Sequence, residues 1–172
     1  MGRSIIRARS STRRNTNPAW ERWLRELRAA GPLTLKVGYL GDGGQLEGGF
    51  TAPQLAALLT YGTADGRIPP RPHVGPAFDA NRAKYERMLA QLLLRSFRGQ
   101  VSLREALGLL GAVMASDIRA FVASPPGVTP PNAESTLRRK LARTRPGAKG
   151  SPLPLIDTGR LLGSITWAVS SE

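Results

Sequence analysis

The stretch PAFDANRAKYERMLAQLLLRSFRGQVSLREALGLLGAVMASDIRAF, residues 76–121, contains two successive helical patterns around which the fold is built. Pro76 can begin a helix, because proline fits the first helical turn, and Arg98-Gly99 can end it. Ser102 and Glu105 form a capping box that begins a second helix. Large apolar residues recur at helical spacing on one face of each helix: Phe78, Tyr85, Leu89 and Leu92, then Leu103, Leu107, Leu110, Met114, Ile118 and Phe121. We expect the two helices to pack as a long antiparallel hairpin.

A shorter helix and a strand are predicted near the N-terminus. Asn17 can accept an orphan amide bond and Pro18 suits the first helical position, so a helix starts here and ends at Gly31-Pro32. Its Trp20, Trp23, Leu24 and Leu27 repeat at helical spacing, which predicts a buried aromatic stripe. In residues 33–39, apolar residues alternate with Thr, Lys and Gly, the pattern of a half-buried strand.

Between this strand and the hairpin, the sequence predicts a loop, a short helix and an extended segment. Thr51 and Gln54 form a capping box for a helix closed by Gly62. The prolines in Ile68 to Pro72 make that segment extended, and it cannot be a central strand. The glycine-rich loop 41–49 lacks the ending of a P-loop and the spacing of a dinucleotide fingerprint. Its two carboxylates are a thin ligand set for calcium.

The C-terminal third begins with a turn-rich, basic stretch from Ser124 to about Pro152, with at most a short helix around residues 134–141. Asp157, Thr158 and Gly159 are expected to form a structural cap and turn, with Asp157 capping one helical turn through Leu162. Apolar residues then alternate over 165–169, which predicts a closing strand.

These elements indicate an α+β fold, with a small, mostly antiparallel sheet packed with helices that include the long hairpin. The chain has 172 residues, 41% of them hydrophobic, which suits one domain better than two. We therefore expect a basic flexible arm over residues 1–16 and a single domain over 17–172, with a basic loop at about 125–153. Short strands far apart in sequence can pair in several orders, so the topology stays open.

Much of the net charge of +13 lies in two segments, residues 3–14 and 138–149, that are poor in large apolar residues. The residues expected to make electrostatic contacts with DNA or acidic partners are Arg3, Arg7, Arg9, Arg13, Arg14, Arg138, Arg139, Lys140, Arg143, Arg145 and Lys149. Such contacts with phosphates need only charge and reach, and neither segment has an aromatic residue to stack bases. The alternative is that both segments are solvated and only aid solubility.

Catalytic chemistry is not expected. His73 is the single histidine and there is no cysteine, which excludes Cys-His and multi-histidine metal sites within one chain. No serine lies in a Gly-x-Ser-x-Gly setting. We therefore predict no catalytic, cofactor or metal site. No apolar run approaches the roughly 20 residues that a bilayer span requires, so we expect no membrane partner. The lack of cysteine suits a reducing cytoplasm.

Four landmarks, in order, give the chain a resemblance to the tail-completion and neck proteins of tailed bacteriophages, including the Mu-like virion morphogenesis proteins. They are Val37-Gly38-Tyr39, the Ala56 to Thr63 helix ending in Tyr-Gly-Thr, the Ile68 to Pro72 segment leading to Pro76-Ala77, and Leu155 to Gly159 with Leu161 and Ile165. The resemblance spans roughly Leu33 to Val169. The chain departs from it in carrying His73 where an aromatic often follows the Arg-Pro pair, and in its basic arm.

The resemblance implies a structural virion protein at the head-tail junction, assembled in the host cytoplasm. It would complete the tail or join it to the head as part of an oligomeric ring, typically a hexamer. Its expected partners are itself, the neighbouring neck, connector or tail-tube proteins, and DNA in the channel. The expected assembly-interface residues are Ile68, Pro69, Pro70, Arg71, Pro72 and Arg160. The alternative function is non-specific DNA binding in phage packaging or assembly.

Overall fold

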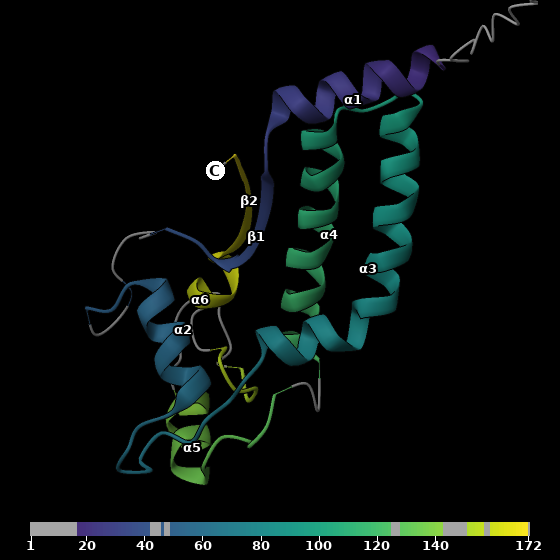
Figure 1. Cartoon of the computed structure of the whole chain (residues 1–172). Helices are drawn as coiled ribbons and strands as arrows, with labels where there is room; N and C mark the ends of the chain where they lie inside the picture. The colour runs from purple at the N-terminus through teal and green to yellow at the C-terminus, as the bar shows by residue number, and fades with distance from the viewer. Residues whose placement is uncertain are drawn as a thin grey trace, which may run out of the picture.

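Two long helices, α3 (Val74–Phe97) and α4 (Leu103–Ala123), lie side by side and antiparallel, with the strands next to α4 (Figure 1). The computed structural model describes residues 17–41, 46, 49–124, 128–142, 151–156 and 159–171. The other elements in it are α1 (Pro18–Ala30), β1 (Leu33–Tyr39), α2 (Ala52–Tyr61), α5 (Glu134–Ala142), α6 (Arg160–Gly163) and β2 (Ile165–Ser171). The α+β class and the long helical hairpin predicted from the sequence are confirmed.

Three of the predicted helix starts are confirmed, those at Asn17, Thr51 and Ser102. The Asn17 side chain accepts a hydrogen bond from the Ala19 amide, and both capping boxes, at Thr51 and Ser102, are formed. The start of α3 differs, because the helix begins at Val74 and not at Pro76. Proline is tolerated there because the first amides of a helix have no carbonyl partner within it.

The sheet has two strands, β1 and β2, which pair antiparallel from Leu33 opposite Ser171 to Tyr39 opposite Ile165. It packs against α4 through glycines. A Cβ atom on Gly111 would lie 2.8 Å from the Leu35 Cδ1 atom and 3.0 Å from the Trp167 Cβ atom, so any larger residue would force these side chains to shift. A Cβ on Gly108 would meet the same Trp167 ring at 3.1 Å.

The core is built where the hairpin meets the sheet. Ala77, Ala115, Ile118 and Ile165 are buried in one cluster, against which Tyr39 and other partly buried residues pack. A second cluster fills the hairpin and contains Tyr85, Leu92, Ala106 and Leu110. A third joins α2 to α6 through Ala52, Ala56 and Leu161, and again touches Tyr39. The expected apolar faces of α3 and α4 therefore lie inward.

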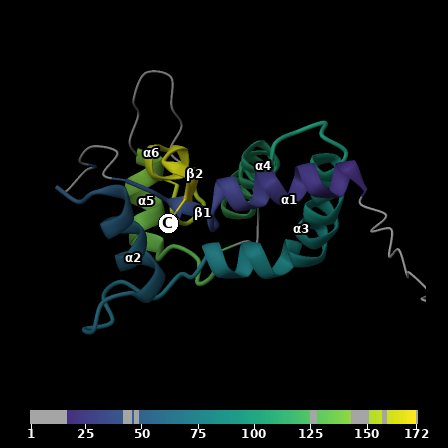
Figure 2. The same ribbon diagram turned by 45° about the horizontal axis from the view of Figure 1, so that its top comes forward.

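Helix α1 crosses the end of the hairpin where α3 turns into α4 (Figures 1 and 2). A Glu26 carboxylate oxygen accepts a hydrogen bond from the Leu103 amide at 2.8 Å, and Arg22 donates to the Phe97 carbonyl at 2.9 Å. The rings of Trp20, Trp23 and Phe97 cluster there. The predicted buried stripe is wrong in degree: α1 has no buried residue and Trp20 is 47% exposed. A helix lying across one end of two others is covered on too narrow a face.

By length and composition alone, α4 would be able to cross a membrane, which the sequence analysis did not expect. It carries four charged residues, Arg104, Glu105, Asp117 and Arg119. It packs against α3 and both strands, and Arg104 and Arg119 donate hydrogen bonds to the carbonyls of Val169 and Ile165 in β2. These contacts are those of a core helix in a folded domain.

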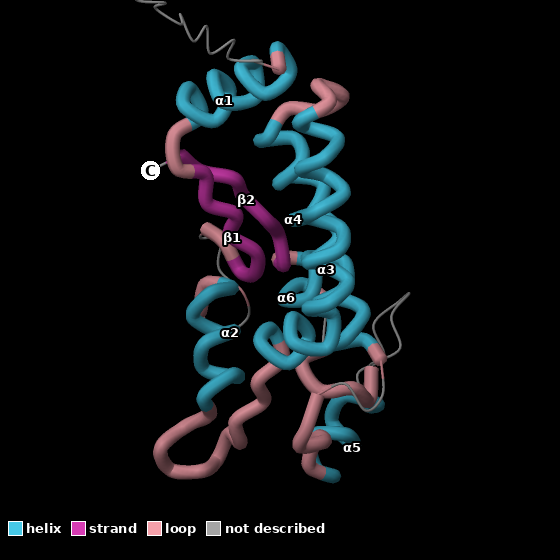
Figure 3. Tube along the Cα trace, turned by 45° about the vertical axis from the view of Figure 1, so that its right-hand side comes forward, coloured by secondary structure: helices cyan, strands magenta, loops and turns pink. Residues whose placement is uncertain are grey.

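The end of the molecule opposite α1 is formed by α2 and α5, with long connecting segments between them and the hairpin (Figure 3). The short helix predicted over residues 134–141 is confirmed as α5. This end contains the proline-rich segment and the basic residues of α5 that the sequence analysis singled out separately.

Candidate functional site

The proline-rich segment Ile68–Pro72 folds back on the C-terminal end of α2. The Ile68 carbonyl accepts a hydrogen bond from the Thr63 amide at 3.0 Å, and the Arg71 amide donates to the Leu59 carbonyl at 2.8 Å. Gly62 makes this possible, because its φ is 73° and a Cβ on it would lie 2.5 Å from the Ile68 carbonyl oxygen. Of the expected interface residues here, Pro70 and Pro72 are exposed, and Ile68 and Pro69 are half-buried.

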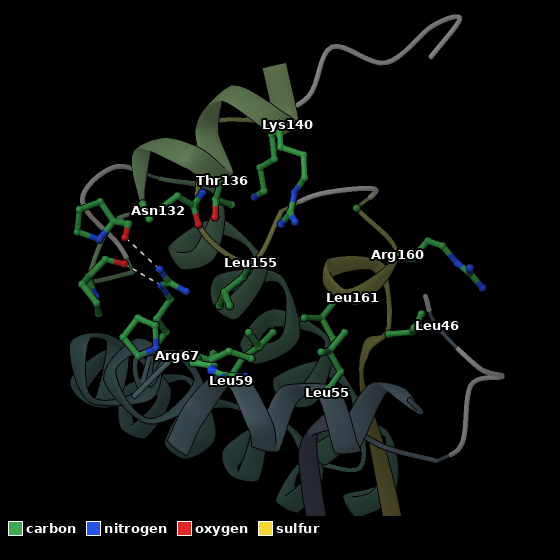
Figure 4. Close-up of a pocket in the computed structure, with 18 residues that line it drawn as sticks. Leu46, Leu55, Leu59, Arg67, Asn132, Thr136, Lys140, Leu155, Arg160 and Leu161 are labelled. Carbon is green, nitrogen blue, oxygen red and sulfur yellow. Dashed lines mark hydrogen bonds between the residues drawn. The ribbon is translucent and has the colours of Figure 1, made fainter. Parts of the chain in front are cut away.

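Arg71, one of the expected assembly-interface residues, does not extend outward from the segment. It is only 9% exposed. Its Nε donates to the Pro130 carbonyl at 2.8 Å and its Nη2 to the Pro131 carbonyl at 3.0 Å, the two dashed lines in Figure 4. Burial lowers the pKa of Arg71 below its ordinary value. The guanidinium turns inward because its fork of donors matches two successive carbonyls, those of Pro130 and Pro131.

Lys140 also departs from the prediction, which made it an exposed electrostatic contact. It is 8% exposed, and its Nζ donates to the carbonyls of Leu153 at 3.0 Å and Ile156 at 2.8 Å. An ammonium group is tolerated in a buried position when several oxygens accept hydrogen bonds from it. Lys140 therefore ties α5 to the segment before α6.

A cavity of about 610 Å³ lies between α2, the proline-rich segment, α5 and α6 (Figure 4). We call it the basic pocket. Five of the eighteen described residues that line it are cationic, and none of the eighteen is acidic: the cations are Arg67, Arg71, Arg139, Lys140 and Arg160. Leu55, Leu59, Leu155 and Leu161 contribute apolar surface. These eighteen residues also include no histidine or cysteine, so they offer groups that bind an anion and no evident general base.

The remaining predicted residues divide into two groups. Arg138 is exposed and pairs with Glu134 at 3.3 Å, whereas the adjacent Arg139 and the more distant Arg160 line the basic pocket. Those lying outside the described residues are Arg3, Arg7, Arg9, Arg13, Arg14, Arg143, Arg145, Lys149, Asp157 and Thr158. Gly159 precedes α6 with a φ of 76° and provides no side-chain cap. The cap expected from Asp157 lies outside the described residues.

His73 forms a buried pair with Tyr39 that the sequence analysis missed. It is 0% exposed, its Nε2 lies 2.8 Å from the Tyr39 hydroxyl oxygen, and its Nδ1 lies 3.0 Å from the Arg71 carbonyl oxygen. Burial lowers the pKa of His73, and the bond to the Arg71 carbonyl opposes this shift. The lone histidine just before a predicted helix was a signal, but its partner on β1 is distant in sequence.

The described residues include no group of three or more His, Cys, Asp or Glu side chains that could hold a metal ion. Comparison of the chain with protein-family models, with curated proteins and with solved structures found no match. The basic pocket is thus the feature on which a functional argument can be built from geometry.

Proposed function

We propose that the protein is a structural component of the head-tail junction of a tailed bacteriophage. It would complete the tail or join it to the head as part of an oligomeric ring, in contact with itself and with neighbouring neck, connector or tail-tube proteins. The sequence resemblance over Leu33 to Val169 is the origin of the proposal.

One observation carries the proposal further: the four landmark stretches lie in contact with one another. Tyr39 pairs with Ile165 across the sheet and contacts His73, which follows the proline-rich segment. Gly62, in the second landmark, packs closely against the backbone of Ile68 and Pro70 in the third. Leu161 of the fourth packs with Ala56 of the second and with Tyr39. Four weak matches that form one continuous unit support the resemblance better than four scattered ones would.

The surface chemistry suits an assembly role. Pro70 and Pro72 are exposed on a segment that is held by hydrogen bonds to Leu59 of α2 and to Thr63 just after it. Little conformational entropy would therefore be lost when this segment meets another subunit. The basic pocket beside it has binding groups without a nucleophile–base pair among its described residues. No enzymatic activity is part of the proposal.

The test is deletion of the gene from the phage genome that carries it, followed by negative-stain electron microscopy of the lysate. We expect separate filled heads and unjoined or misshapen tails, and joined particles again when the gene is supplied from a plasmid. Intact joined particles without the gene would contradict a junction role.

Non-specific DNA binding is the second candidate, favoured by the net charge of +13. A DNA-binding protein would hold duplex DNA in isolation, with an affinity that falls steeply as salt rises, because phosphate contacts release counterions. Anisotropy titrations of a labelled duplex at several salt concentrations distinguish the two functions. A junction protein is expected to bind DNA weakly alone and to purify with assembled particles.

A further inference from the structure

We propose that the basic pocket is a docking site for an acidic segment of a partner protein, one that carries a large apolar side chain beside its carboxylates. The pocket would have this property whether or not the protein belongs to a phage neck.

The charges of the pocket call for an anionic occupant. Neither Arg71 nor Arg139 forms a salt bridge with a described acidic residue. Arg67 does form one, with the exposed Asp65. Arg71 keeps its charge at only 9% exposure, satisfied in part by two neutral carbonyls. A carboxylate entering the pocket would form charge-assisted hydrogen bonds in a partly desolvated setting, where they are stronger than in water.

The apolar side of the pocket selects the kind of anion. Leu55 and Leu59 of α2 face the cavity together with Leu155 and Leu161, and Lys140 lies on the opposite side (Figure 4). A leucine-sized side chain would cover this surface while a neighbouring carboxylate meets the cations. A phosphate of DNA would leave the leucines facing water, and a duplex is too broad for a cavity of about 610 Å³. An acidic peptide fits both sides.

Leu155 adds an independent observation. Its φ is 62°, the one positive φ among the described residues other than glycine, and a side chain with a Cβ is disfavoured there. Glycine would adopt this conformation without strain, yet the residue is a leucine that lines the pocket. Strained backbone conformations cluster at ligand-binding sites, and this one lies in the wall of the basic pocket.

The test uses fluorescence anisotropy with a fluorescein-labelled peptide of alternating aspartate and leucine residues. Two comparison peptides replace every aspartate with asparagine or every leucine with serine, and a thymidine oligonucleotide of equal charge competes. We expect each comparison peptide to bind about tenfold more weakly or worse, and the oligonucleotide to compete poorly. Equal binding of the serine peptide, or full competition by the oligonucleotide, would overturn the proposal in favour of simple charge attraction or DNA.

Matched variants separate the pocket from the general positive charge of the protein. Arg138 and Arg139 are adjacent exposed residues of α5, and only Arg139 lines the pocket. We expect Arg139→Gln to weaken binding of the aspartate–leucine peptide about tenfold and Arg138→Gln to weaken it less than about twofold. Equal losses would overturn the proposal.

Leu155→Gly is the second variant, because it relieves the backbone strain while it removes the apolar wall. Peptide binding should weaken about tenfold, with an unfolding midpoint no lower than that of the natural protein. Unchanged binding would count against the pocket. These measurements use the isolated protein, so their failure is distinct from a negative result of the gene deletion.

Discussion

The Tyr39 hydroxyl oxygen and Nε2 of His73 lie 2.8 Å apart, and this contact joins β1 to the start of α3. Nδ1 of His73 faces the Arg71 carbonyl oxygen, which can only accept, so Nδ1 carries the proton and donates the hydrogen bond. Nε2 is then the acceptor and the Tyr39 hydroxyl the donor. Burial raises the pKa of Tyr39 above its ordinary value, so the hydroxyl keeps its proton. The pair is complete only while the histidine is neutral.

The first prediction concerns pH. Because burial places the pKa of His73 below its ordinary value of 6.5, the unfolded chain binds the proton more tightly than the native protein. The stability that neutral His73 contributes is therefore fully present above about pH 6.5 and declines as pH falls toward the folded-state pKa. Urea denaturation at a series of pH values between about 7.5 and 5 measures it. A His73→Gln variant should have a shallower pH dependence over this range; an identical slope would refute the assignment.

The second prediction removes the donor. Tyr39→Phe leaves Nε2 of the buried His73 without its partner, which we expect to lower the free energy of unfolding by about 1–3 kcal/mol. Tyr61→Phe is the control, because Tyr61 is 81% exposed, and its effect should stay within about 0.5 kcal/mol. Urea titrations of both variants make the comparison. Equal effects would show that the Tyr39 hydroxyl bonds equally well to water.

The third prediction tests the contact between α4 and the sheet. Alanine favours a helix interior over glycine by about 1 kcal/mol. Gly111→Ala should nevertheless destabilise the protein by about 1–3 kcal/mol, because its Cβ would press on Leu35 and Trp167.

The matched control is Gly75→Ala, in the first turn of α3, where no atom lies within 4 Å of the added Cβ. It should be neutral or slightly stabilising. Thermal unfolding followed by circular dichroism distinguishes the two, and a stabilised Gly111→Ala variant would mean that the sheet can move away from α4.

The fourth prediction separates structural from surface cations on α5. Lys140→Met removes the donor to the carbonyls of Leu153 and Ile156, and should lower the free energy of unfolding by about 1–3 kcal/mol. Arg139→Met, at the neighbouring exposed position, should change it by less than about 0.5 kcal/mol. Chemical denaturation compares them. If the two variants were equally stable, the inward position of Lys140 would have no structural role.

Most of the helices could be predicted because their signals are local. Asn17, the Thr51–Gln54 pair and the Ser102–Glu105 pair each act within three residues, so the sequence contains both partners of the interaction. The start of α3 was misplaced by two residues because Val74 and Gly75 carry no such signal, and a proline is accepted anywhere in the first turn.

The site was predictable only in part. Arg71, Arg139, Lys140 and Arg160 were singled out from composition and resemblance, and all four line one cavity. That Arg71 and Lys140 turn inward was not foreseeable, since a basic residue near prolines or on a polar helix is usually exposed. Their acceptors are the carbonyls of Pro130, Pro131, Leu153 and Ile156, and no local sequence pattern marks which carbonyls will accept such distant bonds.

The helices and strands, the hairpin and the excess of positive charge follow from local sequence, because capping, periodicity and composition depend on neighbours within a few residues. Tertiary packing is what pairs β1 with β2, brings His73 to Tyr39, and places the proline-rich segment and α5 around one basic pocket. Those contacts join residues far apart in the chain. Their geometry follows from how the hairpin packs against the sheet, which no local pattern specifies.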